Sequence, residues 1–502
     1  MSVLHGWTGL IPGWVVFIVF LFGTLAFFQQ EISSWMRPEI GRGVLTQATL
    51  EKASHILEAE VPARAAWSLS LPVARGGEPL ELSWRSGPQG REFRETLDPA
   101  TGRPITVRET LGGGFLFSFH YNFHYMPGRI ANYLVCIASL AMLLSIISGV
   151  ITHKRIFKDY FTLRLDKGQR SWLDGHNVMA VLALPFHLMI TYTGLVTLVF
   201  LIMPWAVLTG FPDSEAFRQE FRPRSPAIEV RSDQVAAAAP LRIVSEARAI
   251  NGELPRYVAT HDEDGGSGVI EAWPGLDRLG ASYDTIFFRR DGTLIEPATA
   301  AGGASKTMGV MVDLHSGRFS GYLLRWLYFF SGLVGTAMVA TGLILWVKKR
   351  RVNSAAAGRA AAGLWLAERL NIGVIAGSVA GVAAFFLANR LLPVRLSDRG
   401  EQEVAWLFTT WGVVFLWSLV SAPKRGWIVA LAFGALLYVL VPLVNAVTTA
   451  RGLFPSLVAG DWVFAGFDLS MLATSAVLAL VAWHLYRRPE DDGRAKRASK
   501  AR

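Results

Sequence analysis

The 502-residue sequence contains a single cysteine, Cys136, and this scarcity excludes several classes of protein. One cysteine cannot form an intramolecular disulfide, a CxxCH site for covalent haem or a CxxC redox pair. Because Cys136 lies in the middle of an apolar run, we interpret it as a packing residue. Any haem in this chain must therefore be bound non-covalently.

Nucleotide-binding motifs are absent as well. No Walker-type loop occurs, which excludes ATP as the energy source. Gly112, Gly113 and Gly114 form a glycine run, but the run follows no convincing strand and lacks the GxGxxG spacing. We therefore expect a flexible hinge at this place.

Charged residues are scarce at 18%, whereas hydrophobic residues make up 52% of the chain. This balance is typical of a protein solvated largely by lipid. The formal net charge is +10, yet the basic residues lie just outside apolar stretches. That placement is the positive-inside signature of a membrane protein and predicts the lipid bilayer, not nucleic acid, as the partner.

Apolar segments of the length needed to cross a bilayer, about 20 residues, occur about eight times. We expect a mainly α integral membrane protein. The first segment lacks the basic start and cleavage site of a signal peptide, so we expect a retained helix. Pro185 and Pro204 predict kinks in the third. The expected spans are Trp7–Phe28, Ala131–Thr152, Asn177–Phe211 and Trp326–Val347, with four more within Ala361–Ala388, Val404–Ala422, Gly426–Ala450 and Val463–Tyr486.

Lys and Arg gather in the short loops after spans two, four and six and in the C-terminal tail. This bias predicts that both termini are cytoplasmic. No expected cytoplasmic loop is long enough for a nicotinamide or flavin domain. The predicted parts are 1–28, the first span; 29–128, a first periplasmic module; 129–211, spans two and three with a basic loop; 212–320, a second periplasmic module; 321–351, span four; 352–486, four C-terminal spans; and 487–502, a basic tail.

Each periplasmic segment contains a helix-like stretch, 47–60 or 234–251, followed by alternating strand-like runs. In the first, a strand at 80–84 leads to a turn at 98–102. In the second, a strand at 286–288 leads to Asp291-Gly292. Two similar α+β modules indicate an internal duplication.

Most of the ten histidines lie at or inside the expected spans, where an imidazole is costly unless it has a partner. On a continuous helix, His176 and His187 share one face about 16 Å apart. Such a helix provides one ligand to each of two stacked haems. His120 and His124 are four residues apart and share a face if that segment is helical.

Two layers of histidines follow from these positions. Haem b held by two imidazoles needs one histidine from each of two facing helices. Asp174 and Asp313 are expected as acceptors that orient His176 and His315. A zinc site is disfavoured because no cysteine or close carboxylate–histidine cluster is present. A metal-ion site, a proton relay and purely structural histidines remain alternatives. The cytoplasmic-side layer draws on His5, His153 and His176; the outer layer draws on His187, His124, His120 and His315.

Several motifs resemble the PepSY-associated transmembrane helix family of bacteria. The resemblance runs from residue 5 to about 351, and spans five to eight look like a C-terminal extension of its four-helix core. The motifs are LHGWTGL at 4–10, ISGVITHKR at 147–155, WLDGHN at 172–177, LPFH at 184–187, YTG at 192–194, RWLY at 325–328 and TGLILW at 341–346.

The resemblance implies a bacterial inner-membrane location, two PepSY-like periplasmic modules and a four-helix haem-binding core. Iron-regulated members look like siderophore reductases with two b-type haems. The implied function is to pass electrons from a cytoplasmic or quinol donor to a ferric siderophore in the periplasm, releasing Fe(II). The alternatives are a siderophore or metal-chelate permease without redox activity, and a PepSY-type sensory or regulatory protein.

Overall fold

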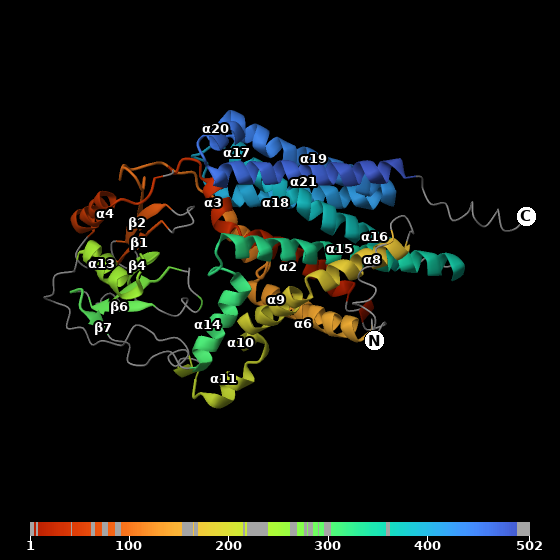
Figure 1. Ribbon diagram of the computed structural model, residues 1–502, viewed down its shortest axis with the longest axis horizontal. Helices are drawn as coiled ribbons and strands as arrows, with labels where there is room; N and C mark the ends of the chain where they lie inside the picture. The colour runs from red at the N-terminus through yellow and green to blue at the C-terminus, as the bar shows by residue number, and fades with distance from the viewer. Residues whose placement is uncertain are drawn as a thin grey trace, which may run out of the picture.

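The computed structural model describes most of the chain and shows a helical bundle with a sheet at one end (Figure 1). We refer to this as the sheet end of the bundle. The described residues are 5–6, 9–41, 43–61, 66–72, 79–85, 92–152, 164, 169–213, 216–217, 239–261, 269–275, 279, 285–289, 291–295, 303–357 and 362–488.

In this part of the chain, 6 helices are long and apolar enough to cross a membrane, and up to 8 spans result if each bent helix pair counts as one. The expected mainly α membrane fold is therefore confirmed. The six are α6 (Gly128–Thr152), α15 (Tyr322–Ala357), α16–η2–α17 (Ala362–Asn371, Ile372–Gly377, Ser378–Leu391), α18 (Arg399–Val420), α19 (Pro423–Thr448) and α21 (Trp462–Arg487). The bent pairs are α2 (Ile11–Ala26) with α3 (Gln29–Met36), and α8 (Gln169–Leu182) with α9 (Leu184–Thr197).

The third expected span is broken at Ala183, where the chain bends by 69° between α8 and α9. Pro185 lies in the first turn of α9, where its missing N–H is tolerated, and it prevents α8 from continuing. The expectation that one continuous helix carries both His176 and His187 is therefore wrong. The rest of this span forms the short helices α10 (Val199–Ile202) and α11 (Trp205–Gly210), with Pro204 directly before α11.

The two expected α+β units share one antiparallel sheet of 7 strands, in the order β3-β2-β1-β4-β5-β6-β7. Each unit is a helix followed by strands, and β1 of the first pairs with β4 of the second. Residues 234–238 of the second expected helix lie outside the described residues. The elements are α4 (Gln47–Glu60), β1 (Ala66–Ser70), β2 (Leu80–Arg85), β3 (Glu92–Leu97), α13 (Pro240–Asn251), β4 (Tyr257–His261), β5 (Val269–Trp273), β6 (Ile286–Arg289) and β7 (Leu294–Ile295).

Alternate strand residues point to the two faces of this sheet. Leu69 and Val258 lie opposite each other across the β1–β4 junction, and both are fully buried. They belong to a core that α4 and α13 cover from one side. The helices meet where the backbone N–H of Leu241 donates to the Ser54 hydroxyl. One hydrophobic core thus spans both halves of the sheet.

The glycine run before the second span is not a hinge, contrary to expectation. Gly112 begins the helix α5 (Gly112–Phe119) with φ of +54°, and Gly113 packs directly on α3. A Cβ at position 113 would lie 2.0 Å from the carbonyl oxygen of Gln29. The glycines therefore allow α5 to pack tightly against α3. The remaining helices are α14 (Gly303–Ser316) and α20 (Leu453–Val458).

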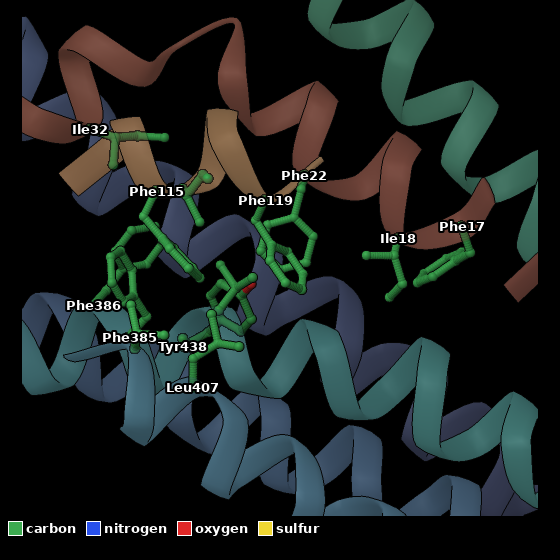
Figure 2. Close-up of a cluster of buried hydrophobic side chains, with 14 of the residues drawn as sticks. Phe17, Ile18, Phe22, Ile32, Phe115, Phe119, Phe385, Phe386, Leu407 and Tyr438 are labelled. Carbon is green, nitrogen blue, oxygen red and sulfur yellow. The ribbon is translucent and has the colours of Figure 1, made fainter. Parts of the chain in front are cut away.

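The C-terminal helices pack against the first half of the bundle through buried aromatic side chains (Figure 2). Phe115 of α5 lies 5.3 Å from Phe385 of α17, between ring centroids. Polar contacts add to this interface, because the Trp14 indole N–H donates to Asn371 and the Trp35 indole N–H donates to Asp468. The C-terminal extension is thus part of one continuous core.

Candidate functional site

Two histidines from separate helices meet at the sheet end of the bundle. His120 directly follows α5, and His315 lies in the last turn of α14. Their ring centroids are 6.1 Å apart. The expectation that these two residues lie at the same level agrees with this contact.

Backbone carbonyls orient both rings. His120 Nδ1 lies 2.5 Å from the Phe117 carbonyl oxygen, and His315 Nδ1 lies 3.0 Å from that of Ile190. A carbonyl oxygen only accepts, so each Nδ1 carries the proton and each Nε2 keeps a lone pair. Burial lowers the pKa of His315 to about 3 and also lowers the pKa of His120. Both imidazoles are therefore neutral at physiological pH, which is the form that binds metals.

A second pair has the same construction at the opposite end of the bundle. His5 and His176 have ring centroids 6.5 Å apart. His5 Nδ1 lies 3.1 Å from the Ser145 carbonyl oxygen, and His176 Nδ1 lies 2.9 Å from that of Met338. The proton is again on Nδ1 in both rings, so the lone pair of each ring lies on Nε2. The structure thus brings together two members of each expected layer.

His187 occupies a level between the two pairs. One ring N–H donates to the Ser331 carbonyl, and the buried Nε2 has no hydrogen-bond partner among the described residues. His187 Nε2 faces Gly335 of α15, and His176 faces Gly342 of the same helix. Seven residues of helix rise by about 10 Å, so the levels of His176 and His187 differ by roughly that distance.

A glycine of a neighbouring helix faces each of these five imidazoles. At position 194, a Cβ would lie 2.8 Å from His315 Cε1, which is too close for any side chain. At position 342, a Cβ would lie 3.1 Å from His176 Cε1. The missing side chains leave space beside the rings. The other three pairs are Gly23 with His120, Gly149 with His5, and Gly335 with His187.

A partly open cavity adjoins the His120–His315 pair. Cofactor pockets are mostly apolar. Both rings line this cavity, together with apolar residues of α2, α6 and α9. We call it the sheet-end cavity.

The remaining expected site residues do not join these groups. His124 Nε2 lies 2.8 Å from a carboxylate oxygen of Glu401 on α18, because the chain turns after His120 and does not continue as a helix. His153 lies outside the described residues. Asp174 accepts hydrogen bonds from Arg164.

The expected acceptors are wrong, because the carbonyls of Met338 and Ile190 orient His176 and His315. Asp174 and Asp313 are each two residues away from their histidine along a helix, and residues at that spacing face different directions.

The two pairs fit haem iron better than other metal centres. Two imidazoles that bind one metal ion from opposite sides, each at about 2 Å, have ring centroids roughly 6 Å apart. Both pairs match this separation, and all four Nδ1–H groups have the carbonyl acceptors that metal-bound histidines need. No group of three or more His, Cys, Asp or Glu side chains that could hold a metal ion occurs among the described residues. A porphyrin fills all but two of the coordination positions of its iron, so a haem needs two ligands from the protein.

Sequence reasoning missed the five glycines and the carbonyl acceptors. A signal for the glycines was present, because Gly149, Gly194 and Gly342 lie in the motifs ISGVITHKR, YTG and TGLILW. The acceptors left no signal, since every residue has a carbonyl group and only the fold selects one.

The fold and the paired histidines define a multi-pass helical membrane protein with a sheet domain at one end. A family model described as the PepSY-associated TM region matches residues 2–349, so the chain belongs to that family. The uncharacterized protein PA4219 of Pseudomonas aeruginosa is 26% identical over 374 residues, which cover 71% of this chain and 90% of that protein.

Proposed function

We propose that this protein is an inner-membrane haem b electron conduit that reduces siderophore-bound ferric iron on the periplasmic side. The observation that carries the proposal is the presence of two histidine pairs, His5 with His176 and His120 with His315, at opposite ends of one bundle. Haem bound at each pair supplies one-electron transfer.

The side chains around the pairs support this role by orienting the imidazoles and by giving them apolar surroundings. Carbonyl acceptors hold each Nδ1–H, so Nε2 of each ring would be the atom that holds a haem iron. Apolar residues line the sheet-end cavity, and a low-polarity shell of this kind affects the redox potential. Phe20 lies 6.0 Å from His187, between ring centroids, and fills the level between the pairs.

Electron flow then has a direction. The sequence contains no nicotinamide, flavin or ATP-binding motif, so a cytoplasmic protein or a membrane quinol provides the electron to the His5–His176 level. His120 and His315 would hold the haem from which one electron passes to a chelated ferric ion, giving Fe(II). Hard oxygen ligands hold Fe(II) less strongly than Fe(III), and iron is released.

The test begins with the optical spectrum of protein purified from haem-replete cells. We expect a reducible Soret band and α-band, and two haems per chain by the pyridine haemochrome assay. In proteoliposomes reduced with dithionite and then freed of it, a ferric hydroxamate chelate added outside should reoxidise the haem, and ferrozine should capture equivalent Fe(II). A colourless, haem-free preparation would exclude the proposal.

The two alternatives give other results in the same system. A permease moves labelled chelate into the vesicle lumen without Fe(II) formation, and the break between α8 and α9 is the feature that favours it. A sensory protein keeps its function after His176→Ala. Fe(II) formation that requires bound haem, without uptake of intact chelate, distinguishes our proposal from both.

A further inference from the structure

Arg369 of α16 is a buried cation whose guanidinium lacks hydrogen-bond acceptors. The residue is 7% exposed, and its enclosed Nε and Nη1 have no hydrogen-bond partner among the described residues. Glu368, the acid next to it in the chain, pairs with Arg351 at 2.7 Å. The guanidinium carbon lies 5.6 Å from the centre of the Trp365 ring, a contact that supplies no acceptor to the N–H groups. A buried charge is costly in this state unless an opposite charge meets it.

The same membrane span contains a second buried arginine, Arg390, and this one has acceptors. Its Nε donates to Asn445 at 2.8 Å, and its Nη2 donates to the Trp35 carbonyl. Residues 370–389 between the two arginines include no charged side chain, and a helix of this length rises by roughly 30 Å, the thickness of the hydrocarbon core. Arg369 therefore lies at the level of the lipid head groups, at the end of the bundle away from the sheet (Figure 1).

A second donor without an acceptor lies close to this level. The enclosed indole N–H of Trp417, near the end of α18, has no hydrogen-bond partner in the described part of the chain. The next residue, Ser418, has its hydroxyl 3.2 Å from the Arg369 carbonyl, which brings α18 against α16 here. The first turn of α19 adds Lys424 and Arg425, and the Arg425 guanidinium carbon lies 5.7 Å from the centre of the Trp417 ring. This end of the C-terminal helices thus combines positive charge with unsatisfied donors.

The position of Arg369 selects the kind of anion. A guanidinium forms paired hydrogen bonds with a phosphate, and the phosphates of a bilayer lie at the head-group level. Basic pockets between membrane helices bind anionic lipid head groups, and tryptophans gather at the same interface. Trp365 is 46% exposed, so the guanidinium lies directly behind a side chain on the outer surface of the bundle.

We propose that Arg369 binds the phosphate of an anionic phospholipid, in the leaflet that the loop charges predict to be cytoplasmic. The site is separate from the histidine pairs and does not depend on haem. Asn371, two residues further on, accepts from the Trp14 indole at 2.8 Å and donates to the Leu343 carbonyl at 3.1 Å. A lipid bound at Arg369 therefore stabilises the packing of the C-terminal helices on α2 and α15.

The experiment uses the full-length protein in detergent, freed of native lipid. It compares wild type, Arg369→Met and Arg369→Lys, with Arg425→Gln as the matched control, because Arg425 is an exposed arginine near the same level. Native mass spectrometry with dioleoylphosphatidylglycerol measures the Kd of the first lipid, and thermal unfolding measures its effect on stability. We expect Arg369→Met to bind this lipid roughly 10- to 100-fold more weakly than wild type, and Arg425→Gln to bind it almost unchanged.

The unfolding midpoint gives a second signature. Without lipid, Arg369→Met should be at least as stable as wild type, because the unpaired buried charge is gone. With phosphatidylglycerol, the midpoint of wild type should rise and that of Arg369→Met should not. Trp417→Phe, which removes only the indole N–H, should weaken lipid binding less than Arg369→Met does.

Each contrary result overturns the inference. Equal lipid affinity of wild type and Arg369→Met excludes the site, and an equal loss in Arg425→Gln means that surface charge alone attracts the lipid. Stabilisation by inorganic phosphate to the same extent assigns Arg369 to a soluble anion, and equal binding of dioleoylphosphatidylcholine excludes selection for an anionic lipid. If Arg369→Met does not fold, Arg369→Lys decides, because its ammonium cannot form the paired hydrogen bonds. Its affinity should fall roughly 3- to 10-fold, and an unchanged affinity overturns the assignment.

Discussion

The imidazoles of His120 and His315 meet with ring centroids 6.1 Å apart, although α5 positions one ring and α14 positions the other. Each ring has its Nδ1 on a carbonyl acceptor, so the lone pair of each ring lies on Nε2. We expect His120→Ala and His315→Ala to lose the same single haem, with the haem content falling from two per chain to one. His5→Ala and His176→Ala should lose the other haem. The pyridine haemochrome assay and low-temperature α-band spectra measure both effects.

The control for this series is His124→Ala. His124 is only four residues from His120, but it pairs with Glu401 and does not line the sheet-end cavity. Both haems should remain in this variant. Loss of a haem from His124→Ala, or two haems in His315→Ala, contradicts the pairing. Loss of a haem from His187→Ala would assign Nε2 of that residue as a ligand.

Gly194 tests whether the space beside the ring matters as much as the ligand itself. A Cβ at this position would lie 2.8 Å from His315 Cε1, so Gly194→Ala must displace the ring from its Ile190 carbonyl acceptor. Loss of such an orienting contact weakens metal binding about 10- to 100-fold, so we expect weaker binding of the sheet-end haem by that factor. The haem at His5 and His176 should be unaffected. Competition with apomyoglobin measures the release of each haem.

Gly412→Ala is the matched control for this substitution. Gly412 lies within α18, and nothing is within 4 Å of the Cβ that would be added. Alanine favours a helix interior over glycine by up to about 1 kcal/mol, so this variant should retain both haems and be at least as stable as wild type. Equal haem release from the two variants would show that the clash between the added Cβ and His315 does not weaken haem binding.

Much of the fold follows from local sequence rules. The helix at Gln47–Glu60 agrees with the expected stretch, and the turn after β3 forms because Asp98 accepts from the backbone N–H of Ala100 and Thr101. Gly102 completes that turn with φ of +61°. Apolar length alone predicts the membrane helices, because a lipid environment leaves few other solutions for the backbone.

The site was less predictable because tertiary contacts decide it. A histidine pattern indicates which side chains need partners, but it does not give the bend at Ala183 that places His176 and His187 on different helices. The pattern of helices and strands likewise does not predict the β1–β4 pairing, because each α+β unit has a complete helix-and-strand pattern of its own. The β1–β4 pairing joins segments far apart in the sequence, whereas Pro185 indicates the bend locally.

The contact between the C-terminal helices and the sheet end includes a buried ion pair. Arg399 and Glu403 of α18 are both 0% exposed, and Arg399 also donates to the Glu109 carbonyl at 2.9 Å. Removal of one partner from such a pair costs about 3–5 kcal/mol, because the other charge remains buried. We therefore expect Arg399→Met to lower the thermal unfolding midpoint strongly in detergent solution. The double variant, Arg399→Met with Glu403→Leu, should lower the midpoint less.

An exposed pair provides the comparison. Arg85 and Glu92 lie 3.4 Å apart with side chains 50% and 43% exposed. Such pairs contribute at most about 1 kcal/mol, so Arg85→Gln should change the unfolding midpoint little. If Arg399→Met is no more destabilising than Arg85→Gln, the buried pair does not stabilise this interface.

The junction of the two sheet halves can be tested by a disulfide between β1 and β4. Ser68 lies opposite Ala259, and Ala259 lies opposite Glu271 on β5. Neighbouring strands are about 5 Å apart, whereas a disulfide requires Cα atoms within roughly 7 Å. In a Cys136→Ala background, Ser68→Cys with Ala259→Cys should cross-link under mild oxidation. Ser68→Cys with Glu271→Cys should not, because two strand spacings separate these positions by roughly 10 Å. Electrophoresis after cleavage of the chain between the two sheet halves detects the cross-link. Cross-linking of only the second pair would mean that the halves are not joined through β1 and β4.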